Sequence, residues 1–413
     1  MEHLKRPTIL RKAVIKNKFI LKTIESFFGR VSFSVFSMFF SLVCTRMYGS
    51  EAFGEYIYAF TLVQFIMIFS KAGLDNGLIY YIPKYGNKYT SLSLVVNTIF
   101  SAFFILIGCV FIKDQFIKLM LPLIWLLSME SIFFSLYRAD GKIREYYFIN
   151  GFVSLLLRIL LVMLFYFFIG KNVTSIALAV YISFIFSNLM YFFQNKDSFK
   201  KITFDKDFLK YSFALIFATT MGVIVEKIDI IMLGSMMTKR DVGIYQVAVQ
   251  LANTLAIISA VFNTVFAPRI SQLYHSGKQE ELKRTYILST RILGLVSLAT
   301  LVILSALSKY ILLFWGEEII EGQLVLILKA IGQSITTAVG SAWLMLAMTG
   351  KSRIQMYGNL AALLINIFLN FLLIPDYGIN GAAFASSIAL AFLGILGYVL
   401  VSREFKVKVF GVI

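Results

Sequence analysis

The sequence predicts an all-α membrane protein with about 12 transmembrane helices, arranged as two six-helix bundles related by pseudo-two-fold symmetry. Three observations support this fold class. The 413-residue chain is 59% hydrophobic and 15% charged, whereas soluble proteins are about 45–50% apolar and about 25% charged. Its apolar residues form runs long enough to cross a bilayer, and the second half of the chain resembles the first. This composition excludes a water-soluble enzyme or binding domain.

The apolar segments give the helices in order along the chain, because a spanning helix needs about 20 predominantly apolar residues. In the first half they lie near residues 24–46, 53–82, 91–112, 116–137, 147–169 and 174–194. In the second half they lie near residues 208–235, 242–267, 285–307, 323–348, 357–375 and 381–401. Turn-forming or charged segments separate them, including Gly49-Ser50, Pro83-Lys84, Gly170-Lys171, Gly234-Ser235, Pro268-Arg269 and Gly378.

The remaining segments set the expected domain boundaries. Residues 1–22 form a basic N-terminal segment, and residues 23–194 form the first bundle. The polar linker 195–207, NKDSFKKITFDKD, is the expected hinge region between the bundles. Residues 208–402 form the second bundle, and residues 403–413 form a tail.

Positive charge is distributed unevenly over the expected connections. Because cytoplasmic segments retain Lys and Arg, the basic N-terminal segment predicts that the chain starts inside. No small-residue cleavage site follows it, so we do not expect a removable signal peptide, and we expect a surface helix touching anionic lipid. The expected outer connections hold few cations: Arg46, Lys113, Lys118, Lys171, Lys239, Arg240 and Lys309. Both termini are therefore expected in the cytoplasm, and the net charge of +17 requires no nucleic acid partner.

The internal repeat is visible at equivalent turns. Gly49-Ser50 followed by Gly54-Glu55-Tyr56 matches Gly234-Ser235 followed by Gly243-Ile244-Tyr245. Because each half holds six helices, both halves would start on the same side of the membrane, which predicts a parallel repeat about an axis along the membrane normal. Chance similarity among apolar helices is the alternative.

Further motifs carry a family resemblance. They are Arg46-Met-Tyr-Gly-Ser-Glu-Ala-Phe-Gly-Glu-Tyr, Lys71-Ala-Gly-Leu-Asp-Asn-Gly-Leu, Glu226-Lys-Ile-Asp-Ile-Ile-Met-Leu-Gly, Asp241-Val-Gly-Ile-Tyr, Ala267-Pro-Arg-Ile-Ser and Ile374-Pro-Asp-Tyr-Gly-Ile-Asn-Gly-Ala-Ala. In this order and spacing the chain resembles the polysaccharide-biosynthesis flippases of O-antigen and capsule repeat units. Those flippases belong to the exporter superfamily that includes the multidrug and toxin extrusion (MATE) transporters and the lipid II flippase. The resemblance covers nearly the whole chain.

The resemblance implies a MATE-like fold, in which the two bundles surround a cavity that opens alternately to each side. It implies a flippase that translocates an undecaprenyl-pyrophosphate-linked oligosaccharide from the cytoplasmic to the outer leaflet of the bacterial inner (plasma) membrane. The partners implied are this lipid-linked oligosaccharide, membrane lipids, a polysaccharide polymerase and a chain-length regulator.

Polar residues at membrane depth are the candidates for the site. A charge at the centre of a spanning helix costs about 2.5–3.5 kcal/mol, so it usually faces a bundle interior or a wet cavity. Because Arg and Lys bind phosphate, the expected substrate-binding cations are Arg30, Arg158, Lys71, Arg291, Lys227 and Lys329. The candidates for coupling to H+ or Na+ are Glu226, Asp229, Asp75 and Glu130. The candidates for sugar contacts are Asn366, Asn370, Gln64 and Gln333.

Other roles stay open for several of these residues. Lys71 and Asp75 are one helical turn apart, so one alternative is that they neutralise each other. Glu226 and Asp229, with a lysine between them, form either a structural ion-pair cluster or a coupling site. Lys329, like Arg291, is close enough to a helix end to snorkel toward the interface. The amides can equally bond across helix interfaces.

Two rival functions are weighed against a flippase. A MATE-type multidrug or cation antiporter would fit a cavity dominated by acidic and aromatic groups, and the cationic excess disfavours it. A membrane-embedded glycan polymerase or ligase needs a large external loop, whereas the longest outer segment, residues 308–322, is short. Thr349-Gly-Lys-Ser352 has Met345 where a phosphate-binding loop needs glycine, and no metal-ligand spacing occurs. We therefore expect a transporter rather than an enzyme, with no metal and no cofactor besides a coupling ion.

Overall fold

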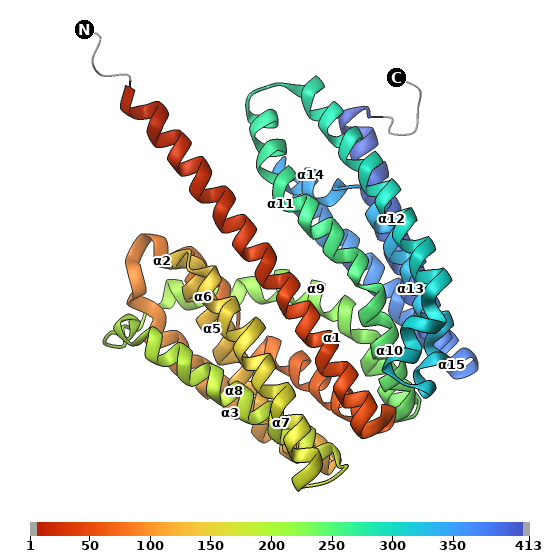
Figure 1. Cartoon of the computed structure of the whole chain (residues 1–413). Helices are drawn as coiled ribbons and strands as arrows, with labels where there is room; N and C mark the ends of the chain where they lie inside the picture. The colour runs from red at the N-terminus through yellow and green to blue at the C-terminus, as the bar shows by residue number, and fades with distance from the viewer. Residues whose placement is uncertain (1–5, 408–413) are drawn as a thin grey trace.

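The computed structural model of the chain describes residues 6–407, and its regular elements there are helices (Figure 1). The first half contains α1 (Arg6–Ser70), α2 (Leu74–Tyr85), α3 (Thr90–Phe111), α4 (Gln115–Met120), α5 (Leu123–Asp140), α6 (Ile143–Phe148), α7 (Leu155–Phe168) and α8 (Val173–Gln194). The second half contains α9 (Lys206–Met236), α10 (Lys239–Ala252), α11 (Thr254–His275), α12 (Gln279–Trp315), α13 (Gln323–Ala338), α14 (Ala342–Met348) and α15 (Ser352–Phe405). Short helical turns at Gly86–Tyr89, Ile149–Ser154, Lys196–Ser198 and Glu317–Gly322 connect them.

The expected spans map onto these helices in order, and two of the helices contain more than one span. α1 covers the first expected span and most of the second, and α15 covers the last two. Each is broken at a glycine with positive φ, at Gly49 (88°) and Gly378 (53°). Glycine adopts such angles without the clash that a Cβ would cause. The chain therefore turns at these two glycines from one crossing into the next.

Several other crossings are interrupted. The second crossing breaks at Ala72 and Gly73, with φ of 50° and 70°, and continues as α2. The fifth consists of α6, a π-helical turn at Ile149–Ser154, and α7. Irregular backbone at membrane depth is tolerated where it is buried in protein or lines a wet cavity. We therefore expect the irregular backbone at these breaks to face the protein interior and not the lipid.

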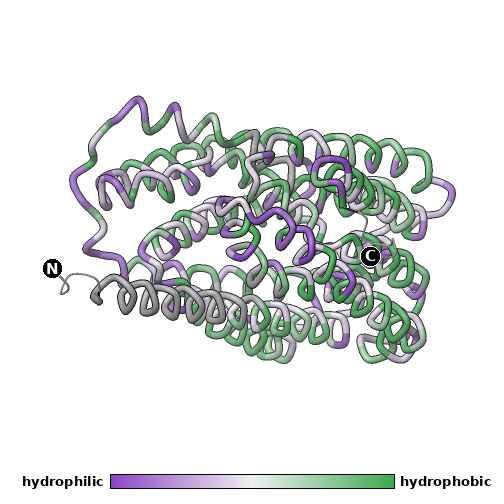
Figure 2. Tube along the Cα trace, turned by 90° about the horizontal axis from the view of Figure 1, so that it is seen from above, coloured by the Kyte–Doolittle hydropathy of each residue, from purple (hydrophilic) through white to green (hydrophobic). Residues whose placement is uncertain are grey.

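Large apolar side chains cover much of the outer surface. Phe111, Phe167 and Phe168 are each 78–80% exposed, and Figure 2 shows hydrophobic residues running along the helices. A soluble monomer rarely exposes contiguous apolar patches of this kind. Within residues 6–407, nine segments are long and apolar enough to cross a membrane, and Ile354–Phe405, with 52 residues, is long enough for two crossings. The chain is a multi-pass membrane protein.

The helices of the first half and those of the second half form two groups, which meet at one end of the molecule and diverge at the other. α9 passes between the groups, and α1 packs along α10 (Figure 1). We call the end at which they meet the closed end. It consists of residues 46–54 of α1, residues 239–243 of α10, and residues 313–321, which cover the end of α12 and part of the helical turn that follows it. Toward the opposite end, α1 and α11 separate (Figure 1). The interior is therefore sealed more tightly on one side.

Two glycines at equivalent positions of the repeat, Gly54 and Gly243, make the closest approach at the closed end. A Cβ on Gly54 would lie 1.7 Å from the Lys239 carbonyl oxygen and 2.6 Å from the Gly243 nitrogen. A Cβ on Gly243 would lie 2.1 Å from the Ser50 carbonyl oxygen. Small residues let helix backbones approach in this way in membranes. The halves therefore seal through backbone contact that any side chain would obstruct.

Arg46 adds a polar contact between the halves at this end. Its Nε donates to the Phe314 carbonyl oxygen at 2.9 Å, and its Nη2 donates to the Leu313 carbonyl oxygen at 2.8 Å. The last carbonyls of a helix lack intrahelical partners and carry partial negative charge. The guanidinium of the first half therefore caps α12 of the second half. Ser50 also donates to Glu318 across the same boundary.

The linker after α8 is attached to the first half. Asn87 Nδ2 donates to Ser198 Oγ at 2.8 Å, and the Tyr89 hydroxyl donates to Asp205 Oδ2 at 2.5 Å. Asp205 also caps α9, because its Oδ1 accepts from the Phe208 backbone nitrogen at 3.1 Å. The hydrogen bond from Tyr89 lowers the pKa of Asp205. This connection is thus held by specific contacts at the start of α9.

Candidate functional site

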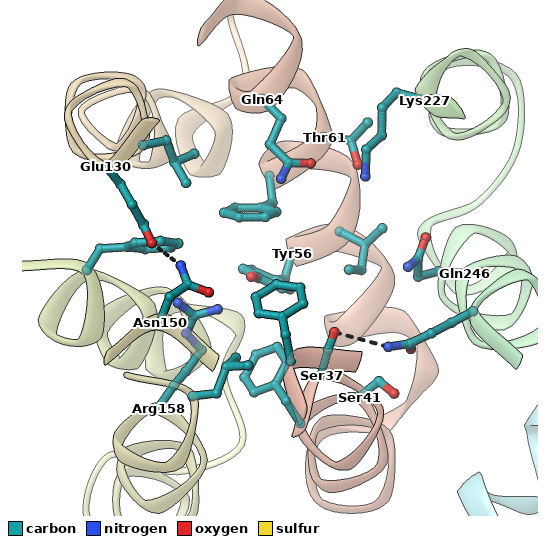
Figure 3. Close-up of a pocket in the computed structure, with 18 of the residues that line it drawn as sticks. Ser37, Ser41, Tyr56, Thr61, Gln64, Glu130, Asn150, Arg158, Lys227 and Gln246 are labelled. Atoms are coloured by element: carbon teal, nitrogen blue, oxygen red, sulfur yellow. Dashed lines mark hydrogen bonds between the residues drawn. The ribbon is translucent and has the colours of Figure 1, made fainter. Parts of the chain in front are cut away.

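A cavity of about 380 Å³ lies between the two halves. α1 contributes to its centre, α5, α7 and α8 form the wall of the first half, and α9 and α10 form the wall of the second half (Figure 3). Gln250 Nε2 of α10 donates to Ser37 Oγ of α1 at 3.1 Å, which joins the two halves at the cavity wall. The polar groups of this shared space determine what can occupy it.

Arg158 of α7 presents a buried guanidinium to the cavity. The residue is 8% exposed, and its Nε donates to Ser183 Oγ at 2.9 Å. The guanidinium carbon lies 4.4 Å from the ring centroid of Phe184 and 5.7 Å from that of Phe40. Cation–π contact stabilises the charge without using its N–H donors. Among the described residues Arg158 forms no ion pair, so its terminal amino groups can bind an anion.

Glu130 of α5 brings a carboxylate to the same cavity. It is 5% exposed and accepts hydrogen bonds from Asn150 Nδ2 and from the Tyr146 hydroxyl, the latter at 3.4 Å. Asn150 lies in the π-helical turn between α6 and α7, and such turns are frequent at functional sites. Neutral donors therefore surround this carboxylate, so it can take up a proton or accept a hydrogen bond from a hydroxyl group.

The second half contributes Lys227 of α9 and Gln246 of α10, which point into the cavity from the side opposite Arg158 (Figure 3). Gln64 of α1 lies between these walls, and its buried Oε1 has no hydrogen-bond partner among the described residues. Arg158 and Lys227 thus face one space from different halves. A polyanion placed there would contact both halves at once.

Aromatic rings form much of the remaining wall. Tyr56 and Phe60 of α1 stack with centroids 5.4 Å apart, and Phe60 stacks on Phe184 at 6.3 Å. These rings offer flat apolar faces to the cavity. The cavity therefore combines separated charges with surfaces that can pack against the apolar face of a sugar ring.

A second polar group lies within the second half and does not line the cavity. Asp229 of α9 accepts hydrogen bonds from the Tyr245 hydroxyl at 2.8 Å, from Ser386 Oγ at 2.6 Å and from Asn370 Nδ2 at 2.9 Å. Lys329 of α13 pairs with Asp229 Oδ2 at 3.4 Å. These residues are at most 7% exposed, so this is a buried ion pair with three neutral donors.

Asn366 belongs to the same group. Its Oδ1 accepts from Asn370 Nδ2 at 2.6 Å. Two of the four amides predicted as sugar contacts, Asn366 and Asn370, therefore belong to the group around the buried pair and do not line the cavity. This is the helix-interface role that the sequence left open for them.

Lys71 and Asp75 pair with each other at 2.7 Å at the break between α1 and α2. Ser131 Oγ of α5 also donates to Asp75 Oδ2, at 3.3 Å. Neither charge lines the cavity. Their arrangement is the mutual neutralisation that the one-turn spacing indicated.

The remaining predicted site residues lie apart from both groups. Arg291 of α12 and Glu226 of α9 are exposed, and Gln333 of α13 is half-buried. Arg30 belongs to α1, but its side chain lies outside the described part of the chain. The structure thus brings Arg158, Lys227, Glu130 and Gln64 together at one cavity and gathers Lys329, Asp229, Asn366 and Asn370 elsewhere.

With this geometry established, comparison with known proteins identifies the family. Residues 22–274 match the family model described as polysaccharide biosynthesis protein, and residues 214–372 match the MatE family model. The first match covers more than half of the chain.

The chain belongs to the polysaccharide biosynthesis protein family.

Two relatives agree with this family. The chain is 23% identical over 371 residues to the capsular polysaccharide biosynthesis protein CapF of Staphylococcus aureus, which covers 86% of this chain and 92% of CapF. It is 28% identical over 201 residues to the probable low-salt glycan biosynthesis flippase Agl15 of Haloferax volcanii, which covers 48% of this chain and 41% of Agl15.

Solved structures share the fold of this polysaccharide biosynthesis family member. An inward-facing multidrug resistance MATE family transporter has a TM-score of 0.73 at 12% identity, covering 91% of this chain and 94% of that one. An outward-facing structure of a MATE family transporter has a TM-score of 0.64 at 12% identity, covering 95% and 96%. The MATE-like helical fold expected from the sequence is confirmed, and the family match and the flippase relative indicate a transporter rather than an enzyme.

Several residues that position the charged side chains of the two polar groups were not singled out by the sequence. Ser183 and Asn150, which hold Arg158 and Glu130, carry no charge and lie on other helices, so no local pattern marks them. Tyr245 was noticed only as a marker of the repeat, yet its hydroxyl binds Asp229. A signal was available for Tyr245, because a Tyr hydroxyl that is buried usually has a hydrogen-bond partner.

Proposed function

We propose that this protein is a flippase that translocates an undecaprenyl-pyrophosphate-linked oligosaccharide, an O-antigen or capsule repeat unit, from the cytoplasmic to the outer leaflet of the bacterial inner membrane. Its membership of the polysaccharide biosynthesis family and the names of its relatives support a polysaccharide precursor as cargo. A polysaccharide polymerase and a chain-length regulator would then act on the product at the outer leaflet.

One observation carries the proposal: Arg158 and Lys227 face the same cavity from different halves. A diphosphate is rejected by hydrocarbon, as any isolated buried charge is. Arg binds phosphate oxygens through paired N–H donors, and Lys adds a mobile point charge. Because the two cations belong to separate helix groups, a bound diphosphate would be held while the groups rearrange. The aromatic wall suits the attached sugar.

The direction of transport follows from topology in this proposal. With both termini in the cytoplasm, residues 46–54 and 239–243 lie on the outer side, so the closed end is the outer gate. The cavity then faces the cytoplasm, where the lipid-linked glycan is assembled. Opening the closed end and closing the opposite one would expose the same cavity to the outer leaflet, which is alternating access.

Ion coupling is assigned in this proposal to Glu130. Its carboxylate lines the cavity and is bound by neutral donors, so a proton can neutralise it when a diphosphate enters beside it. Asp229 already has a cation at 3.4 Å, and Glu226 is exposed. A proton gradient would therefore act at the wall that the first half contributes to the cavity.

Proteoliposomes test the proposal. They would contain undecaprenyl-diphosphate-linked oligosaccharide, and a membrane-impermeant glycosidase would report the fraction of glycan that becomes accessible. We expect wild-type protein to make the inner-leaflet pool accessible and Arg158→Gln to slow this by about tenfold or more, since hydrogen bonds to charged groups contribute about 1.5–3 kcal/mol.

Arg138→Gln is the matched control, because Arg138 is exposed at the end of α5. Equal rates for Arg158→Gln and wild type at equal melting temperature would refute the assignment of the cavity. Transport of cationic drugs without any glycan accessibility would instead favour the multidrug antiporter.

A further inference from the structure

The buried group around Lys329 and Asp229 contains the kinds of oxygen atoms that bind cations in proteins. Asp229, Asn370 and Ser386 converge from α9 and from two parts of α15, and Tyr245 reaches it from α10. All four are at most 4% exposed. Carboxylate, amide and hydroxyl oxygens are the ligands that hard metal cations take in proteins. Four polar side chains from three helices therefore meet at the Asp229 carboxylate, which is more than is needed to pack two helices together.

The charge balance of this group is already complete. The Lys329 ammonium lies 3.4 Å from Asp229 Oδ2, and the side chains of the two residues are 9% and 5% exposed. One positive and one negative charge leave no net attraction for a free cation. A metal ion added here would carry an uncompensated charge into a buried region, which is strongly unfavourable. The amine therefore opposes the binding of a free cation by its charge.

An unused acceptor in the group indicates what removal of the amine would leave. Asn370 is fully buried, and its Oδ1 has no hydrogen-bond partner among the described residues. Asn366 Oδ1 lies beside it, bound to Asn370 Nδ2 at 2.6 Å. Without the Lys329 amine, Asp229 would be an unpaired buried carboxylate beside the hydroxyls of Tyr245 and Ser386 and the amide of Asn370, and the group would carry a net negative charge.

We propose that the Lys329 ammonium is a tethered counter-ion that fills a monovalent-cation site, so that the wild-type protein binds no Na+ there and removal of the amine creates a Na+ site. The consequence for transport is that any cation coupling must act through other groups. The inference concerns cation binding alone and does not depend on the identity of the cargo.

Thermal melting of the purified full chain tests the inference, with Na+ replaced by choline at constant ionic strength. We expect no Na+-specific shift for the wild type. Lys329→Met should gain a saturable rise in melting temperature with Na+, of roughly 2 °C or more at saturation. Lys329→Met combined with Asp229→Asn is the matched control and should lose that rise, because it removes the carboxylate ligand together with the excess charge.

The measurement is independent of glycan transport, so a failure of the proposed cargo leaves it intact. A Na+-specific shift in the wild type that Asp229→Asn abolishes would overturn the inference. So would a folded Lys329→Met variant with no Na+ response. If Lys329→Met does not fold in choline, the wild-type comparison decides alone: absence of a Na+ shift supports a filled site, and a shift that Asp229→Asn abolishes refutes it.

Discussion

At the scale of single residues, two buried charges of similar sequence context are stabilised in different ways. Arg158 is held by a hydroxyl and two aromatic rings, which leaves its terminal donors unused. Lys329 is held by a carboxylate and is fully compensated. Only the first arrangement suits an anion that must bind and leave. The difference depends on partners from other helices and is invisible in the local sequence.

Ser183 is a positioning residue for Arg158, and we predict that Ser183→Ala slows glycan flipping by about fivefold. The reason is that the Nε of Arg158 loses a buried acceptor at 2.9 Å, and a hydrogen bond of this kind contributes about 1 kcal/mol or more. Proteoliposome flipping rates would measure the effect.

Ser187→Ala is the control for this prediction, because Ser187 lies on the same helix and donates to the Phe184 carbonyl oxygen within that helix. Ser183→Thr should restore the rate, since it returns a hydroxyl. Equal slowing by both alanine variants would show a general packing effect and contradict the positioning role.

At the scale of elements, helix breaks and close crossings do most to shape the interior. Gly49 and Gly378 turn the chain between crossings, and the π-helical turn brings Asn150 to Glu130. The sequence predicted a turn at Gly49 and a boundary between two spans, 357–375 and 381–401, in which Gly378 lies. It did not predict the π-helical turn, since one extra residue within an apolar run leaves no compositional signal.

We predict that Gly54→Ala opens the closed end. Its new Cβ would lie 1.7 Å from the Lys239 carbonyl oxygen. Alanine favours a helix more than glycine does, so the expected opening comes from the clash between the two halves and not from a weaker helix. The measurement uses a background without native cysteines, in which Gln246→Cys places a thiol in the cavity. An impermeant thiol reagent added outside intact cells should label this thiol several-fold faster in Gly54→Ala than in the protein that keeps Gly54.

Gly294→Ala provides the control, because its nearest contact would be an ordinary 3.7 Å. An unchanged labelling rate in Gly54→Ala, with normal amounts of protein in the membrane, would contradict the assignment of these contacts to an outer gate.

Asp205 gives the start of α9 a pH-dependent stability. Its folded pKa is lowered by the Tyr89 hydrogen bond and then by the backbone amides of α9. The stabilisation is therefore present above the unfolded pKa, about 3.9, and is lost as the pH falls through the lower folded pKa. We predict that wild-type melting temperature drops below about pH 4 more steeply than that of Asp205→Ala.

At neutral pH, Asp205→Ala should lower the stability of this helix start by about 1 kcal/mol, as expected for loss of an N-terminal cap. Asp205→Asn keeps a capping side chain without the titrating charge, so it should melt close to wild type at pH 7 and show the flatter acid profile. Parallel acid profiles for all three proteins would contradict this role.

At the scale of the whole molecule, the sequence predicted the helical class, the order of the spans and the relation to MATE-like transporters, and the fold and family comparisons confirm them. Hydrophobic run length, a local property, predicts the helical class and the order of the spans, whereas the relation to MATE-like transporters was predicted from the resemblance of the motifs to that superfamily. The site was predictable only in part. Arg158, Lys227, Glu130 and Gln64 were singled out by polarity at membrane depth, whereas the grouping of Lys329 with Asp229 depends on how α9 and α13 pack.

The account rests on the claim that cations from both halves bind a diphosphate head group in the cavity. Mass spectrometry of lipid retained by the purified protein, expressed in cells that make a lipid-linked glycan, tests this most directly. We predict a diphosphate-linked glycolipid on the wild type and on Arg138→Gln/Lys210→Gln, which removes two exposed cations. Arg158→Gln/Lys227→Gln should lose it. Equal retention by the two double variants, or a retained lipid without a diphosphate, would contradict the claim.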